Sequence, residues 1–70
     1  MTPARLRKKL FKFIAARVGD SADAEDIVQE TLISVYDSLP LFQGKSAFLT
    51  WAYGIAKHEL ADFYRKKKIK

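Results

Sequence analysis

The sequence contains no cysteine and only one histidine, so it offers neither a disulfide nor an obvious set of metal ligands. A core built from about 70 residues supplies only about 3–5 kcal/mol without such a staple. We therefore expect one domain spanning residues 1–70, stabilised further by a partner or by a larger parent chain. The lack of cysteine also agrees with a reducing compartment.

Long apolar runs are absent as well. No stretch approaches the roughly 18 apolar residues of a membrane span, and the N-terminus has no uninterrupted apolar core of the kind a signal peptide carries. We expect a cytoplasmic protein with no membrane contact.

Catalytic patterns are missing too, because there is no glycine-rich phosphate loop and no cysteine nucleophile. His58 and Asp62 lie one helical turn apart, but the helical zinc-protease pattern requires histidine at both positions and a further ligand. We interpret them as a surface pair. The sequence thus predicts a protein that is not an enzyme and needs no cofactor.

Charge is abundant, and it is segregated along the chain around a net charge of +5. Residues 1–19 carry six basic side chains and no acid: Arg5, Arg7, Lys8, Lys9, Lys12 and Arg17. Residues 20–37 carry six acids and no base: Asp20, Asp23, Glu25, Asp26, Glu30 and Asp37. From residue 38 onward, seven bases face two acids. Basic segments attract nucleic acid or anionic membrane, whereas an acidic helix needs another partner; the alternative interpretation is three solvated helix faces.

The apolar spacing predicts an all-α fold, a three-helix bundle with helices at about 3–18, 22–39 and 47–67. Gly19 ends the first helix, Asp20 or Ser21 caps the second, and Pro40 ends the second. A loop over 40–46 follows, anchored by Leu41 and Phe42, with Ser46 as a candidate cap. The predicted apolar face of the second helix comprises Ile27, Val28, Leu32, Val35, Tyr36 and Leu39. In the third helix, one side comprises Phe48, Trp51, Ala52, Ile55, Ala56 and Phe63, and another comprises Tyr53, Leu60 and Tyr64.

The acids of the second helix need two explanations. Negative charge in a first turn stabilises a helix by about 0.3–1 kcal/mol per residue, which accounts for Asp23 to Asp26 but not for Glu30. Asp26, Gln29 and Glu30 lie three and four residues apart and share one face. Such a face suits an arginine-bearing protein surface and would repel DNA phosphate.

The third helix and its leading loop combine aromatic with basic and amide side chains. Phe42, Phe48, Trp51 and Tyr53 are accompanied by Gln43, Lys45, Lys57, His58 and Arg65. Unpaired bases stack on such rings for about 1–3 kcal/mol each, while cations meet the phosphates. The alternative is that the rings belong to the core, which we expect of Trp51. The basic run 65–70 is either a phosphate binder or a solvated tail. Gly54, in mid-helix, indicates either close helix packing or room for a ligand.

Three segments together resemble region 2 of a bacterial RNA polymerase sigma factor, of the extracytoplasmic-function (ECF) group in the sigma-70 superfamily. They are Gly19–Leu32, Phe42–Trp51 and Ile55–His58, the last followed by Asp62, Arg65 and Lys66. The order and spacing agree with the family over about residues 10–68. The resemblance implies a sigma2-like bundle. Relatives usually also have an earlier helix and a C-terminal helix-turn-helix domain, which we expect to be absent from this chain, whether it is an excised domain or a reduced relative.

The resemblance also implies roles for individual residues. Asp26, Gln29 and Glu30 would dock on the clamp helices of the largest subunit of core RNA polymerase. The loop 41–48 and the start of the third helix would capture an unpaired base from the single-stranded non-template strand of the promoter −10 element. The implied DNA-binding residues are Phe42, Lys45, Phe48, Ile55, Lys57, His58, Arg65 and Lys66, with Phe48, Ile55 and His58 bordering the base pocket.

The chain differs from the family at two places. Trp51-Ala-Tyr-Gly54 replaces the usual Trp-Leu-Tyr-Arg, and His58 stands where asparagine is common. Two alternative functions stay open: a protein-interaction fragment that binds polymerase or an anti-sigma factor without acting on DNA, and a generic basic helical binder of DNA or membrane.

Overall fold

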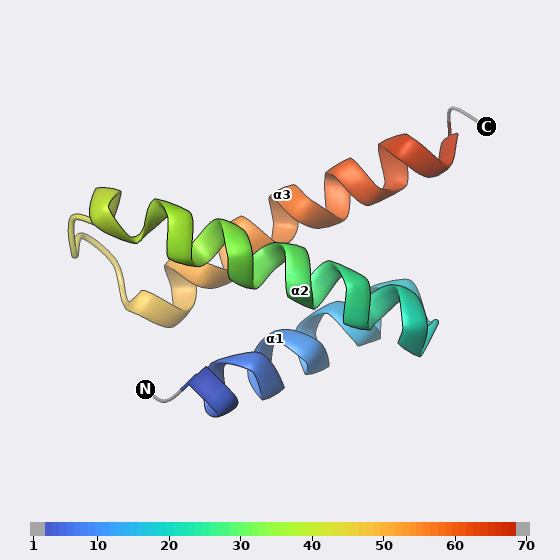
Figure 1. Cartoon of the computed structure of the whole chain (residues 1–70), viewed down its shortest axis with the longest axis horizontal. Helices are drawn as coiled ribbons and strands as arrows, with labels where there is room; N and C mark the ends of the chain where they lie inside the picture. Colours follow the sequence, from blue (N-terminus) through green and yellow to red (C-terminus); the bar gives the residue numbers. More distant parts are fainter. Residues whose placement is uncertain (1–2, 69–70) are drawn as a thin grey trace.

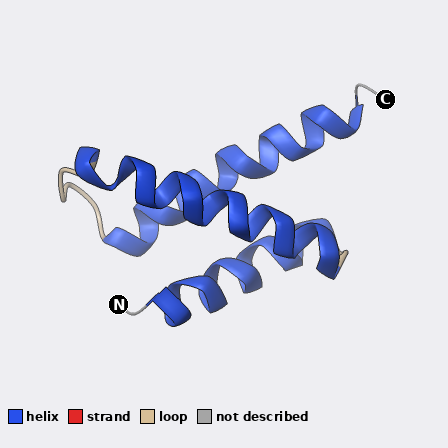
Figure 2. Cartoon of the chain, viewed as in Figure 1, coloured by secondary structure: helices blue, strands red, loops and turns tan. Residues whose placement is uncertain are grey.

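The computed structural model describes residues 3–68, which form three α-helices and, within that range, no β-strand (Figure 2). Helix α1 spans Pro3–Val18, α2 spans Ser21–Ser38 and α3 spans Phe48–Lys68. Helices α1 and α2 run antiparallel as a hairpin, and α3 crosses behind α2, so that the start of α1 and the end of α3 lie at opposite ends of the molecule (Figure 1). The predicted all-α three-helix bundle is confirmed. Ile69 and Lys70, the last two residues of the predicted basic run 65–70, lie outside the described residues.

A two-residue turn joins α1 to α2, and its local chemistry agrees with the prediction. Gly19 ends α1 with a φ of +73°, which a residue without Cβ adopts at little cost. Its N–H donates to the carbonyl of Ala15 at 3.1 Å. Asp20 is the N-cap of α2, because its Oδ1 accepts the backbone N–H of Asp23 at 3.0 Å.

The second connection differs in detail from the prediction. The chain continues beyond α2 into a short 3₁₀ helix, Leu39–Leu41, because Pro40 occupies a first-turn position where its missing N–H is not needed. The irregular segment therefore spans only 42–47. The predicted cap Ser46 is wrong, since the carbonyl of Ala47 accepts the first helical N–H, from Trp51 at 3.0 Å.

The core lies where the three helices meet, and each helix contributes one stripe. The buried side chains are Leu6, Leu10 and Ile14 of α1, Ala24, Ile27, Val28, Thr31 and Val35 of α2, and Ala52, Ala56 and Leu60 of α3. Three assignments from the sequence change. Leu60 joins the α3 core stripe, because it follows Ala52 and Ala56 at four-residue steps. Tyr36 and Leu39 leave the α2 core and are exposed, because the core stripe of α2 follows Ala24, Thr31 and Val35 instead.

Thr31 is a polar side chain in this core, and it is satisfied internally. It is completely buried, and its hydroxyl donates to the carbonyl of Ile27 at 2.7 Å. Since a buried hydroxyl without a partner would cost about 1–3 kcal/mol, this bond allows threonine in the core.

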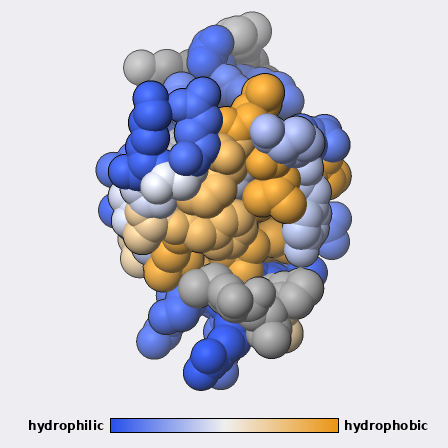
Figure 3. All heavy atoms as spheres, turned by 90° about the vertical axis from the view of Figure 1, so that its left-hand side faces the viewer, coloured by the Kyte–Doolittle hydropathy of each residue, from blue (hydrophilic) through white to orange (hydrophobic). Residues whose placement is uncertain are grey.

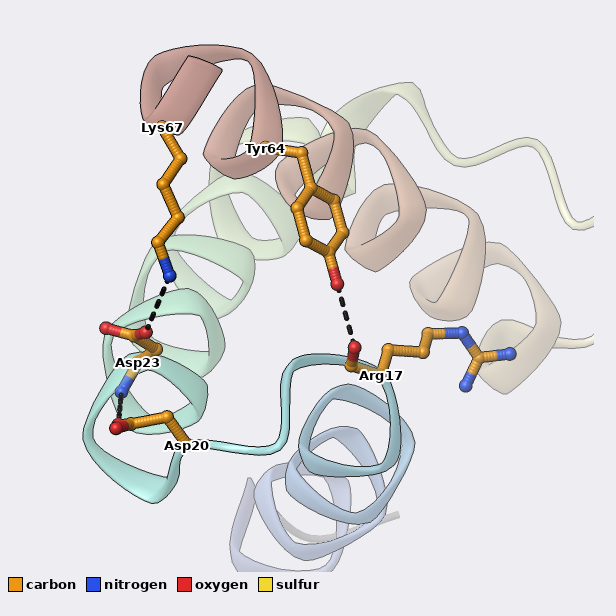
Figure 4. A network of polar contacts seen from close by, with 5 residues as sticks. All are labelled: Arg17, Asp20, Asp23, Tyr64 and Lys67. Carbon is orange, nitrogen blue, oxygen red and sulfur yellow. Dashed lines mark hydrogen bonds and ion pairs between the residues drawn. The ribbon is translucent and has the colours of Figure 1, made fainter. Parts of the chain in front are cut away.

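Polar contacts tie the α1–α2 turn to the C-terminal half of α3 (Figure 4). The Tyr64 hydroxyl donates to the carbonyl of Arg17 at 2.7 Å, and Lys67 Nζ lies 3.8 Å from Asp23 Oδ2. We call Arg17, Asp20, Asp23, Tyr64 and Lys67 the turn-end network. The carbonyls in the last turn of α1 have no hydrogen-bond partner within the helix, and the Tyr64 hydroxyl supplies one for the carbonyl of Arg17.

Among the helices that the structure describes, none is both long and apolar enough to cross a membrane.

Candidate functional site

The outward face of α2 carries the three residues predicted to bind polymerase. Asp26, Gln29 and Glu30 are all exposed, on the side of α2 opposite the buried Thr31 and Val35. The structure thus places the three side chains together on one accessible surface.

The remaining acids of the N-terminal half of α2 have internal partners. Asp20 caps the helix, Asp23 lies beside Lys67, and Glu25 Oε2 accepts from the guanidinium of Arg7 at 2.8 Å. Within residues 3–68, by contrast, no hydrogen bond or ion pair engages Asp26 or Glu30. The α2 acids therefore divide into a structural group and a group left available for a partner.

Two apolar residues of this face are absent from the predicted site. Ile33 and Tyr36 are 55% and 51% exposed, and they continue the Gln29 row at four- and three-residue steps. The sequence could have indicated this for Ile33. It lies two residues from both Thr31 and Val35, so it cannot share their face of the helix and must face outward. We name Asp26, Gln29, Glu30, Ile33 and Tyr36 the outer α2 face.

A shallow groove separates the edge of this face from α3. It is lined by Asp26, Ile27 and Glu30 of α2 and by Glu59, Asp62, Phe63 and Lys66 of α3. Ser34 of α2 donates to Oε1 of Glu59 at 2.8 Å, which holds the two helices in register along this edge. Lys66, predicted to meet DNA phosphate, therefore lies beside the acids predicted to meet polymerase.

Three aromatic rings gather where the 42–47 segment enters α3. The ring centroids of Phe42 and Trp51 are 4.8 Å apart, those of Phe48 and Trp51 are 5.7 Å apart, and those of Phe42 and Phe48 are 5.8 Å apart with nearly perpendicular planes. These separations are typical of favourable aromatic pairs. We name Phe42, Phe48 and Trp51 the aromatic cluster. All three are half-buried, so the cluster both packs the loop and presents ring surface to solvent.

The loop before the cluster exposes further apolar surface. Leu41 is 77% exposed, whereas Phe42 packs into the cluster, so only Phe42 anchors the loop as predicted. Figure 3 shows apolar side chains gathered on this end of the molecule, with hydrophilic side chains around them. Lys45 follows in an exposed bend after Gly44, whose φ is +71°.

The predicted DNA-binding residues of α3 fall into three positions around the helix. Phe48, Ile55, His58 and Arg65 follow one another at intervals of seven, three and seven residues and lie along one side. Lys57 lies one turn after Tyr53, whose ring stacks on Phe13 of α1 at 4.7 Å, so Lys57 projects on the α1 side. Lys66 borders the groove beside α2. The structure therefore does not gather all the predicted phosphate contacts into one surface.

Asp62 pairs with Arg65 at 2.8 Å rather than with His58, so the surface pair expected of His58 does not form. Arg65 is exposed and its ion pair is solvated, which makes the guanidinium easy to release to another anion. Over the part of the chain that the structure describes, no group of three or more His, Cys, Asp or Glu side chains could hold a metal ion.

Gly54 is exposed, and a Cβ built on it would meet no neighbouring atom within 4 Å. Close helix packing, one of the two explanations for this mid-helix glycine, is therefore wrong. The open space leaves room for a ligand beside the row of Phe48, Ile55 and His58.

The comparison with protein families places residues 4–69 in Sigma-70 region 2. The chain is 35% identical over 63 residues to a probable RNA polymerase sigma factor of Haemophilus influenzae, covering 90% of this chain and 32% of that protein. It is 37% identical over 59 residues to the ECF RNA polymerase sigma factor SigX of Bacillus subtilis, covering 84% of this chain and 30% of that protein. The ECF RNA polymerase sigma-E factor of Escherichia coli is 46% identical over 50 residues, which covers 71% of this chain and 26% of that protein.

The chain thus spans about a third of the length of the curated relatives it matches. No solved structure matches it. The family match covers nearly the whole sequence and agrees with the three-helix architecture: the chain belongs to the sigma-70 region 2 family.

Proposed function

We propose that this chain binds core RNA polymerase through the outer α2 face and captures unpaired bases of the promoter −10 element at the aromatic cluster. The observation that carries the proposal is that α2 leaves Asp26 and Glu30 exposed and unpaired within the described residues, whereas its other N-terminal acids are engaged. The family membership supplies the partners, since every relative named above is an RNA polymerase sigma factor.

The outer α2 face has the composition of a protein-binding surface. Ile33 and Tyr36 supply apolar and aromatic area, and the carboxylates of Asp26 and Glu30 supply charge beside it. Interfaces commonly combine an aromatic or aliphatic anchor with a polar rim. Carboxylates also accept bidentate hydrogen bonds from arginine, so we expect a basic helical partner, namely the clamp helices of the largest polymerase subunit.

The DNA side of the proposal rests on the aromatic cluster and the open space along α3. Half-buried rings fixed against one another offer stacking surfaces that need no rearrangement on binding. A base captured there is removed from the duplex, so binding free energy stabilises the opened strand and no chemical step is required. Phe48, Ile55 and His58 would border the captured base, and Lys45 and Arg65 would meet its flanking phosphates.

Replacing Asp26 and Glu30 by arginine tests the polymerase side. We expect the double reversal to lower affinity for core RNA polymerase at least 100-fold in a pull-down or titration, because two attractive contacts become repulsive. The control introduces the same two arginines at exposed positions of α3, Thr50→Arg and Ala61→Arg, without removing an acid, and should bind as the unchanged chain does. Equal binding by both variants would contradict the proposal. Circular dichroism checks that each variant remains helical.

Selection from a randomised pool of single-stranded DNA tests the other side and works even when the promoter sequence is not known. We expect the unchanged chain to enrich a short motif and Phe48→Ala to bind that motif at least about fivefold more weakly, as lost stacking of about 1–3 kcal/mol per base requires. The control is Thr50→Ala, an exposed change on the same helix. If the unchanged chain enriches no motif but still binds polymerase, the result would favour the alternative function, a fragment that binds polymerase or an anti-sigma factor without acting on DNA.

A further inference from the structure

The six basic residues of α1 divide into two groups with different surroundings. Arg7 pairs with Glu25 of α2 at 2.8 Å. Arg17 donates to the carbonyl of Phe13 at 2.9 Å, and its guanidinium lies 3.7 Å from the centre of the Phe13 ring. The other four, Arg5, Lys8, Lys9 and Lys12, line one shallow depression on the surface. We name these four residues the basic stripe.

The basic stripe occupies the solvent side of α1. Its members are separated by three and four residues, so they share one face, and all four are exposed. The opposite face carries Leu6, Leu10 and Ile14, which are buried in the core. Within residues 3–68, no hydrogen bond or ion pair engages Lys8, Lys9 or Lys12.

This arrangement weakens the helix that carries it. Like charges three and four residues apart repel one another, and Lys12 stands in this relation to both Lys8 and Lys9. Positive charge near a helix N-terminus also opposes the helix dipole, and the first turn of α1 contains no acid that would offset it. The basic stripe therefore destabilises α1 and contributes nothing to the core. Binding of a polyanionic partner would explain why these charges are present.

We propose that the basic stripe is a binding surface for the phosphate backbone of nucleic acid, separate from the aromatic cluster and indifferent to base sequence. Lysine presents a compact point charge on a flexible stem, which can meet a single phosphate oxygen without a fixed geometry. A row of such charges at successive turns suits a polymer that carries one phosphate per nucleotide.

Two other polyanions fit less well. A helix that binds a membrane surface needs an exposed apolar face, but the apolar face of α1 is the one that forms the core. An acidic protein segment is the remaining alternative, and nucleic acid is favoured over it because its charges repeat regularly along the polymer, as those of the stripe repeat along α1.

The position of α1 relates the stripe to the proposed function. The N-terminal end of α1 lies at the same end of the molecule as the 42–47 loop (Figure 1). A strand held at the aromatic cluster could therefore extend along α1. The identity of the nucleic acid as promoter DNA rests on the proposed function, but phosphate binding by the stripe does not depend on base capture.

The test compares the unchanged chain with the triple variant Lys8→Gln, Lys9→Gln and Lys12→Gln. Binding to single-stranded and duplex DNA of several sequences is measured by fluorescence anisotropy across a series of salt concentrations. Each phosphate contact contributes about 0.7–0.9 to the slope of log K against log salt, so we expect the slope to fall by about 2–3. We expect affinity at low salt to fall about equally for every sequence. The matched control, with arginine at the same three positions, should retain the slope.

A second readout does not depend on DNA. Glutamine and lysine have similar helix propensity, so removing the repulsion should raise the melting temperature of the triple glutamine variant by a few degrees or leave it unchanged. Folding failure therefore does not obscure the binding result.

An unchanged salt slope in the glutamine variant would overturn the proposal. So would a loss confined to one enriched sequence, or a loss of binding to phosphatidylserine–phosphatidylcholine vesicles without a change on DNA. Phe48→Ala distinguishes phosphate binding by the basic stripe from base capture at the aromatic cluster. If Phe48→Ala leaves the sequence preference intact while the glutamine variant lowers the slope of log K against log salt, phosphate binding by the stripe is supported and base capture at the cluster is contradicted.

Discussion

The two ends of the bundle use the same backbone device but opposite chemistry. Gly19 and Gly44 have φ values of +73° and +71°, so each connection turns through a left-handed residue. At the first, the turn-end network joins all three helices by hydrogen bonds and an ion pair (Figure 4). At the second, the aromatic cluster closes the connection, and Leu41 remains in solvent.

This difference separates structural from functional surface. Polar groups at the turn end satisfy one another, which leaves little for a partner to gain there. Exposed apolar surface at the loop end stays unfavourably hydrated until something covers it. Binding is therefore expected at the loop end and along the outward helix faces, and the turn end is expected to hold the helices in place.

The largest expected effect is at the loop end. Trp51→Ala should lower the free energy of unfolding by about 2–3 kcal/mol, because the ring packs against both phenylalanines but is only half-buried. Urea unfolding, with sucrose present to keep the folded state populated, measures the change. Leu41→Ala is the control at the same end and should change stability by less than about 0.5 kcal/mol. Similar losses in both variants would mean that burial does not distinguish the two side chains.

A smaller effect tests whether the two turns are equivalent. Gly19→Ala and Gly44→Ala should each lower stability by about 1–2 kcal/mol, since each forces a side chain into a left-handed conformation. Gly54→Ala should have the opposite sign and stabilise by about 0.5–1 kcal/mol, because Gly54 is helical and its surroundings are open. Thermal unfolding of the three variants gives the signs. Destabilisation by Gly54→Ala would show that this position is not open.

The smallest effect probes the turn-end network. Tyr64→Phe removes the hydroxyl that donates to Arg17, and because the bond is exposed we expect a loss of about 0.5–1 kcal/mol. Tyr36→Phe is the matched control, since Tyr36 is exposed and its hydroxyl bonds to nothing within residues 3–68. Hydrogen exchange at the end of α1 should accelerate only in the Tyr64 variant. Equal hydrogen-exchange rates in the two variants would mean that the hydrogen bond from Tyr64 to Arg17 does not help to hold α3 to the turn.

Much of the secondary structure was predictable because it depends on local chemistry. Gly19 and Asp20 mark a helix end and a helix start by their own backbone and side-chain preferences, and both act as expected. Pro40 was predicted to end the second helix, and α2 does end at Ser38, but the chain continues through Pro40 as a 3₁₀ helix, because proline tolerates a first turn. Local rules define such a boundary only to within one or two residues.

Which face of a helix meets the core was harder to predict. Tyr36 and Leu39 are apolar and close to the predicted stripe of α2, yet both are exposed, because α1 and α3 cover a different side of that helix. Leu60 changed in the opposite direction for the same reason. The role of each helix acid also depended on neighbours, since Glu25 pairs with a residue 18 positions earlier in the chain.

By itself, the sequence determined the three helices, the segregation of charge and the resemblance to the sigma-70 region 2 family, because helix signals and family motifs are local in the chain. The tertiary structure decided which charges are engaged and which remain available. Arg7 and Arg17 are used internally while Lys8, Lys9 and Lys12 face solvent, and Asp23 is engaged while Asp26 is not. Electrostatic partnership depends on distances between helices, and only the packing of the bundle sets those distances.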